Sequence, residues 1–93
     1  MEVTKKTYNK YTETFMKGFK NEYSVEMVEN PDTNSHVKAV GYYDECLFVK
    51  FKTGIYKYIM CPKKLYEELL KADSWGRFIN ENIKPNYDYD YVR

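Results

Sequence analysis

The sequence predicts an α+β domain: an antiparallel meander of three or four strands, two C-terminal helices packed on one face of it, and an N-terminal helix at an edge. Two periodicities lead to this fold class. Apolar residues recur at every second position between residues 37 and 60, as in strands, and at every third or fourth position before and after this stretch, as in helices. A chain of 93 residues makes one domain, and no apolar run reaches the roughly 20 residues of a membrane span.

Residues 1–34 are expected to form an extension of a separate unit at 35–93, which should fold without it. Turn-forming residues gather between residues 30 and 35 and mark the boundary. Before the boundary, aromatic spacing predicts a helix over residues 7–21, followed by a possible short strand at 23–28, although threonines and Gly18 are weak helix formers. The aromatic residues are Tyr8, Tyr11, Phe15, Phe19 and Tyr23.

The period-two stretch divides into three predicted strands at residues 37–43, 46–52 and 55–60. A tight turn at Thr53-Gly54 predicts a register that pairs Cys46 with Cys61 and Lys50 with Lys57. We expect both cysteines to be free thiols, because two isolated cysteines favour a reducing cytoplasm. One face of the hairpin is then wholly apolar or aromatic and should meet the helices: Leu47, Val49, Phe51, Tyr56, Tyr58 and Met60.

Two helices and an alternating tail should complete the domain. Pro62 is expected at the first position of one helix, and Ser74 should cap the next. The second helix should turn Trp75, Phe78, Ile79 and Ile83 inward. Residues 87–91 alternate strictly, so an extended tail puts three tyrosines on one side and two carboxylates on the other.

The order of these pieces carries a resemblance over residues 35–92. The pieces are Ala39-Val40-Gly41-Tyr42, Leu47-Phe48-Val49-Lys50-Phe51, Gly54, Tyr56-Lys57-Tyr58, Pro62, Tyr66-Glu67-Glu68-Leu69-Leu70, Ser74, Gly76, Phe78, Ile83, Tyr87 and Tyr89. The stretch resembles the KTSC domain, a small domain named after the C-terminus of some lysyl-tRNA synthetases. The resemblance implies a one-domain protein of bacteria or their phages, a suggested RNA-binding role and no catalytic residues. It does not cover residues 1–34.

The motif residues of this resemblance are interpreted as structural. Tyr56 and Tyr58 fall on the apolar face, so we expect their rings to lie beneath the helices, with the hydroxyls at a backbone partner or at the rim. The same structural interpretation covers Tyr42, Pro62, Ser74, Gly76, Tyr87 and Tyr89.

The opposite face of the hairpin is the predicted nucleic-acid site. The whole-chain charge gives no such signal, because 15 Lys+Arg nearly balance 14 Asp+Glu. Locally, Phe48 would stack a base, and the facing lysines would be neutralised either by nearby carboxylates or by an anionic ligand. The predicted binding residues are Phe48, Lys50, Lys52, Lys57, Arg77 and Lys84.

Catalysis is not expected. His36 is the only histidine, and Ser35 beside it points to the opposite side of an extended chain, so the two do not form a dyad. No metal site or cofactor motif is present in the sequence. The alternative function is a protein-interaction module that uses exposed tyrosines and the N-terminal helix, for example a phage-encoded protein that occludes a host protein. It is favoured because one Trp, 11 Tyr and five Phe exceed what a small core buries. Nucleic acid, a protein partner or a second copy are therefore the expected partners, in the cytoplasm and without a membrane.

Overall fold

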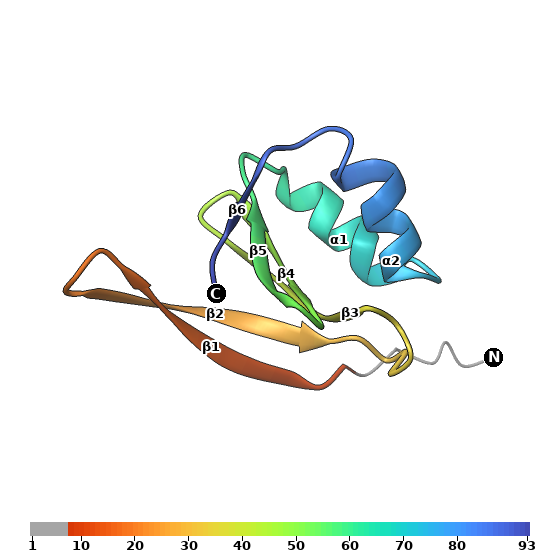
Figure 1. Cartoon of the computed structure of the whole chain (residues 1–93). Helices are drawn as coiled ribbons and strands as arrows, with labels where there is room; N and C mark the ends of the chain where they lie inside the picture. The colour runs from red at the N-terminus through yellow and green to blue at the C-terminus, as the bar shows by residue number, and fades with distance from the viewer. Residues whose placement is uncertain (1–7) are drawn as a thin grey trace.

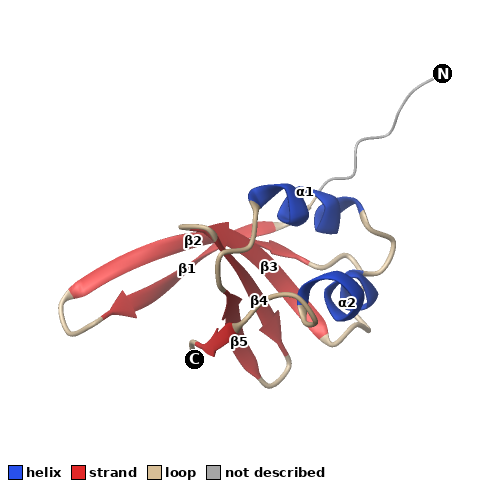
Figure 2. Cartoon of the chain, turned by 90° about the horizontal axis from the view of Figure 1, so that it is seen from above, coloured by secondary structure: helices blue, strands red, loops and turns tan. Residues whose placement is uncertain are grey.

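A computed structural model, in which residues 8–93 are described, shows a mainly β fold (Figure 1). Six antiparallel strands pair in chain order and curl into a half-barrel. The strands are β1 (Lys10–Lys17), β2 (Asn21–Glu29), β3 (Val37–Tyr43), β4 (Cys46–Phe51), β5 (Gly54–Tyr58) and β6 (Tyr89–Tyr91). The helices are α1 (Lys63–Lys71) and α2 (Trp75–Phe78), which runs on into the π-helical turn η1 (Ile79–Ile83). Both helices lie on one side of β3 to β5 (Figure 2).

The predicted fold class was wrong, because the segment expected to be an N-terminal helix forms the β1–β2 hairpin. Tyr11 and Phe15 are four positions apart, a spacing that fits one face of a strand as well as one face of a helix. The intervening Thr12 and Thr14 are β-branched and favour a strand. Gly18 closes the turn with a φ of 74°. Residue 7 of the predicted helix lies outside the described residues, and the possible strand at 23–28 is present within β2.

The hairpin joins the rest of the sheet through a short ladder and then folds across it. β2 pairs with β3 only at Met27–Gly41, Val28–Val40 and Glu29–Ala39. At Gly41 a Cβ atom would lie 2.6 Å from the Met27 sulfur and 2.8 Å from the Glu26 carbonyl oxygen. The sheet therefore uses a glycine at a position of β3 where residues of β2 leave no room for a Cβ atom.

The curled sheet has a core on each of its faces. Helices α1, α2 and η1 cover the apolar face predicted for β4 and β5, which confirms the burial of Leu47, Val49 and Tyr58. The opposite face, expected to be at least partly exposed as a nucleic-acid site, is instead a second core beneath the β1–β2 hairpin. Its buried members are Phe15, Val25, Met27, Ala39, Phe48 and Ile55.

The register of the β4–β5 hairpin differs from the predicted one by two residues. Phe51 pairs with Gly54, so Lys52 and Thr53 form the turn and Lys50 pairs with Ile55 rather than with Lys57. A shift by an even number of residues keeps every side chain on its predicted face. The apolar face was therefore predicted correctly although the register was not. Met60 lies beyond the end of β5 and is exposed.

The two cysteines are not partners in the ladder. Cys46 pairs with Tyr43 of β3, and the Cys61 N–H donates to the Glu45 carbonyl after β5 has ended. Both thiols are free. Burial raises the pKa of the Cys61 thiol to about 11, and Cys46 nearby adds to the rise.

The C-terminal elements follow the predicted order. Pro62 occupies the N-cap of α1 rather than its first helical position, and the Ser74 hydroxyl accepts from the Arg77 N–H at 3.2 Å, which confirms the predicted cap. Trp75, Ile79 and Ile83 are buried in the helix-side core.

We predict that Phe15→Ala lowers the free energy of unfolding by about 3–5 kcal/mol, the usual cost of removing a large buried aromatic side chain. Phe15 is 2% exposed and stacks on Phe48 with ring centroids 5.3 Å apart. Phe19, at the hairpin turn, is fully exposed, so Phe19→Ala should change stability by no more than about 0.5 kcal/mol. Urea unfolding of the two variants tests this prediction, and equal midpoints would show that the hairpin does not cover the second core.

Gly41→Ala should cost about 1–3 kcal/mol, because the added methyl group overpacks the crossing of β2 and β3. Gly76→Ala is the matched control: the nearest atom to its Cβ would be the Ser35 Oγ at 3.7 Å, and alanine is the better helix former. The control variant should unfold at the wild-type temperature or above it. Thermal melts followed by circular dichroism would contradict the prediction if the two variants melted together.

Candidate ligand-binding pocket

Phe48 was wrongly predicted to stack a base. It is only 1% exposed, and the Phe15 ring stacks on it with the two ring planes 30° apart, so its face is already covered. Tyr23 contacts the same ring edge-on, with centroids 6.2 Å apart. The predicted nucleic-acid face is therefore the floor of the second core.

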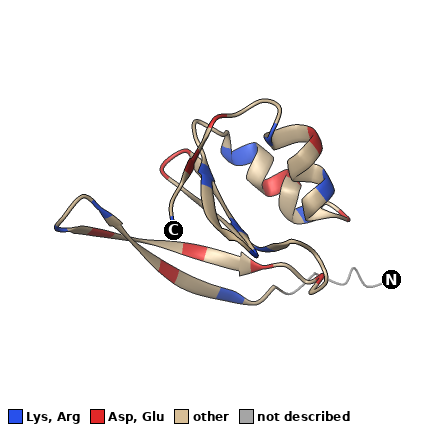
Figure 3. Cartoon of the chain, in the orientation of Figure 1, with Lys and Arg blue, Asp and Glu red and all other residues tan. Residues whose placement is uncertain are grey.

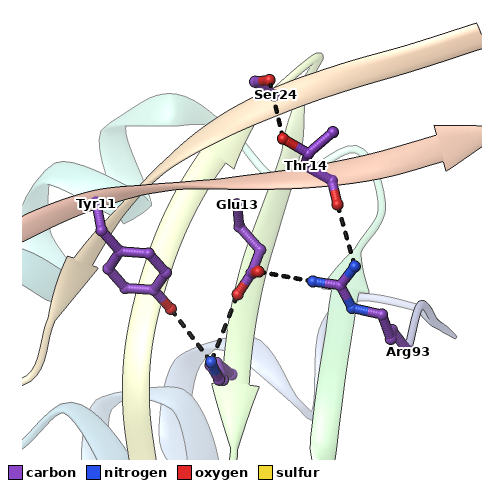
Figure 4. A network of polar contacts seen from close by, with 6 residues as sticks. Tyr11, Glu13, Thr14, Ser24 and Arg93 are labelled. Carbon is purple, nitrogen blue, oxygen red and sulfur yellow. Dashed lines mark hydrogen bonds and ion pairs between the residues drawn. The ribbon is translucent and has the colours of Figure 1, made fainter.

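Lys50 lies on this inner face and is neutralised by a carboxylate, one of the two alternatives that its setting allowed. Its Nζ atom is 3.4 Å from the Glu13 carboxylate and 3.5 Å from the Tyr11 hydroxyl (Figure 4). Partial burial lowers the pKa of Lys50, but Tyr11 and Glu13 outweigh this effect and hold the pKa above the ordinary lysine value. Arg93 completes the network: it donates to Glu13 at 2.6 Å and to the Thr14 carbonyl at 3.1 Å.

Two further predicted site residues lie apart from each other. Lys57 sits opposite Phe48 of β4 and Asp90 of β6, on the inner face of the half-barrel. Arg77 is exposed on α2 and forms an ion pair with Glu81, one turn along, at 3.2 Å. The structure does not bring Arg77 to the sheet lysines.

Lys52 and Lys84, in contrast, line one pocket of about 410 Å³. Lys52 is placed by the β4–β5 turn, where its N–H donates to the His36 carbonyl at 3.2 Å. Lys84 follows η1, and its Nζ atom lies 5.3 Å from the centroid of the Phe51 ring. The lining residues are His36, Phe51, Lys52, Thr53, Tyr56, Tyr58, Lys84 and Tyr89.

Tyrosines of β5 and β6 form the aromatic part of the pocket. Tyr58 is 3% exposed, as predicted, and desolvation raises the pKa of its hydroxyl, which keeps the group neutral. Tyr56 is half-buried and packs edge-to-face against Tyr89, with centroids 5.5 Å apart. Tyr89 is 59% exposed. Tyr56 and Tyr89 therefore line a cavity, whereas the sequence interpretation gave them a structural role only.

Other motif residues do have structural contacts. The Tyr42 hydroxyl donates to the Cys61 carbonyl at 2.6 Å, and its ring stacks on Tyr66 of α1. Ser74 caps α2. Tyr87 packs against the helix-side core.

The charge of the pocket is local. Figure 3 shows Lys, Arg, Asp and Glu distributed over both the sheet and the helices. Within the part of the chain that the structure describes, the pocket lining includes two lysines and a histidine but no carboxylate. Such a lining can hold an anion beside an aromatic ring. Sequence reasoning named the two lysines but missed His36, Tyr56 and Tyr89 as their neighbours, because it paired the C-terminal tail with no strand.

Residues 8–93 contain no group of three or more His, Cys, Asp or Glu residues arranged to hold a metal ion. None of the helices described is both long and apolar enough to cross a membrane.

The protein is a small β-rich domain. Two short helices cover its half-barrel sheet, and a basic, aromatic pocket lies beside it. Its family is shown by comparison: residues 33–87 match the KTSC domain, and the chain belongs to this family, as the sequence resemblance indicated. A protein of Tsukamurella paurometabola is 35% identical over 60 residues, covering 61% of this chain and 90% of its own length. An uncharacterized protein of Stutzerimonas stutzeri is 38% identical over 63 residues, covering 64% and 87%. Neither name states an activity.

We predict that Glu13→Gln destabilises the protein by about 1–3 kcal/mol, because Lys50 and Arg93 lose their shared charged partner. Glu22→Gln is the control. Glu22 is exposed on β2 and forms no ion pair with the described residues, so its loss should cost no more than about 0.5 kcal/mol. Urea unfolding at low and high salt measures both variants. Equal stabilities at low salt would show that the network does not hold the hairpin in place.

Proposed function

We propose that this protein is a non-enzymatic binding module that holds single-stranded nucleic acid in the pocket of Lys52, Lys84 and Tyr89. One observation carries the proposal: the two lysines share the pocket with an exposed tyrosine ring, and no described carboxylate lines it. The proposal retains Lys52 and Lys84 from the predicted site. It omits Phe48, which is buried in the second core, and Lys50, which is paired with Glu13.

The physical basis is the combination of phosphate binding and stacking. Lysines bind phosphates as point charges, and the release of counterions makes this contribution strongly salt-dependent. Aromatic rings stack on bases for about 1–3 kcal/mol per base, whatever the base. A single strand fits better than a duplex, because the bases of a duplex are already stacked on one another.

The alternative function, protein binding, is supported by a different part of the molecule. Phe19 and Met16 at the end of the β1–β2 hairpin are large apolar side chains that are exposed, at 101% and 55%. Such side chains anchor protein interfaces when a partner covers them. This surface does not include any residue of the pocket.

The test is the binding of a fluorescent 12-nucleotide single strand to the wild type and to a Lys52→Gln/Lys84→Gln variant across a salt series. The wild type should lose affinity steeply as salt rises. The variant should bind at least about tenfold more weakly, with a salt slope smaller by about two, one for each phosphate contact. Lys57→Gln, on the opposite face, is the control and should leave both values nearly unchanged.

Equal binding by the double variant and the control would overturn the proposal. Binding by neither the wild type nor the control would do the same. In that case, capture of a protein that Phe19→Ser no longer retains would support the alternative.

A further inference from the structure

The size of the pocket limits what enters it. A volume of about 410 Å³ lies near the lower end of the roughly 300–1,000 Å³ typical of small-molecule sites. This is room for one nucleotide rather than for a run of stacked bases. The pocket is also bounded by side chains from well-separated parts of the chain, among them His36, the β4–β5 turn, β6 and Lys84.

The positive charge of the pocket is larger than the negative charge of one internal phosphodiester of a strand. An internal phosphodiester carries one negative charge, whereas a phosphomonoester carries about −1.5 to −2 at neutral pH. Lys52 and Lys84 supply two positive charges, and His36 also lines the pocket. Because no described carboxylate lines the pocket, a dianion balances the two lysines and a monoanion does not.

The Tyr89 ring is ordered by its neighbours and is accessible to a base. Tyr89 keeps 59% of its surface exposed although Tyr56 and Tyr58 fix its ring, with centroids at 5.5 Å and 5.9 Å. A ring that is already ordered loses little conformational entropy when a base stacks on it. Groups for phosphate and for base contacts therefore line the same small cavity: Lys52 and Lys84 for the phosphate, and the β5–β6 tyrosines for the base.

We infer that the pocket recognises a terminal nucleotide that bears a phosphomonoester, through its phosphate and its base together. This inference rests on the proposed function and narrows it from a strand to the phosphorylated end of a strand. The phosphate sits between Lys52 and Lys84, and the base lies against Tyr89.

The experiment compares matched ligands by isothermal titration calorimetry. The small probes are adenosine 5′-monophosphate, adenosine 3′-monophosphate, adenosine and inorganic phosphate. The strands are 12-nucleotide oligoadenylates with a 5′-phosphate, a 3′-phosphate or hydroxyls at both ends. One monophosphate should bind at least about tenfold more tightly than adenosine or inorganic phosphate, and the strand with that same phosphorylated end should exceed the hydroxyl strand by a similar factor.

Variants assign the two contacts. Lys52→Gln/Lys84→Gln should remove the preference for the phosphorylated end, while Tyr89→Ala should weaken the monophosphate and leave inorganic phosphate unchanged. Lys57→Gln is the control, and circular dichroism melts show that each variant is folded.

The outcomes separate this inference from the proposed function. If all three strands bind equally and still depend on Lys52 and Lys84, the terminal-nucleotide inference fails and strand binding stands. If a monophosphate binds but no strand does, strand binding fails and the pocket is a site for free nucleotides. If no probe binds, both are wrong.

Discussion

The shared contact of Glu13 with Lys50 and Arg93 closes the half-barrel, and the rest of the inner face depends on it. Glu13 comes from β1, Lys50 from β4, and Arg93 follows β6, so one carboxylate joins three distant segments. The Glu13 side chain is only 18% exposed, where an unpaired charge would be costly. Arg93 also donates to the Thr14 carbonyl on the edge strand β1 and lies over the Phe15 ring at 5.1 Å. The Arg93 side chain, which pairs with Glu13, therefore also covers part of the sheet edge and part of the second core.

Closure of the inner face determines where a ligand can bind. Once β1 lies across β4, Phe48 has aromatic neighbours and Lys50 has a carboxylate, so neither is free for a ligand. On the other face, α1, α2 and η1 cover the centre of the sheet but leave the β4–β5 turn and the β6 edge beside a cavity. The two uses of the sheet are thus divided between its faces: stability on the inner face, and an accessible pocket at the margin of the helix-covered face.

Much of the structure from β3 onward could be predicted from the sequence, because its periodicities are local. The alternation in β4 and β5 fixes which side chains share a face, and Ser74 marks the start of α2 by its own hydrogen bond. The β1–β2 hairpin could not be predicted in this way, because the spacing of Tyr11 and Phe15 fits a strand and a helix equally well. The partner of Lys50 lies 37 residues away, and no local pattern reveals whether a distant carboxylate or a ligand neutralises that lysine.

The pocket was only half predictable for the same reason. Lys52 lies in a turn and Lys84 follows η1, so only the tertiary structure brings them to one pocket, where the pairing of β6 with β5 adds Tyr89. Tyr58 and Tyr89 differ in burial, and this difference lets a small domain have both a core and a binding site. Tyr58 is buried and supports the fold, whereas Tyr89 is 59% exposed, so its contribution to apolar burial is smaller. An aromatic side chain that the core does not need for stability is one that can change, or bind a ligand, without unfolding the domain.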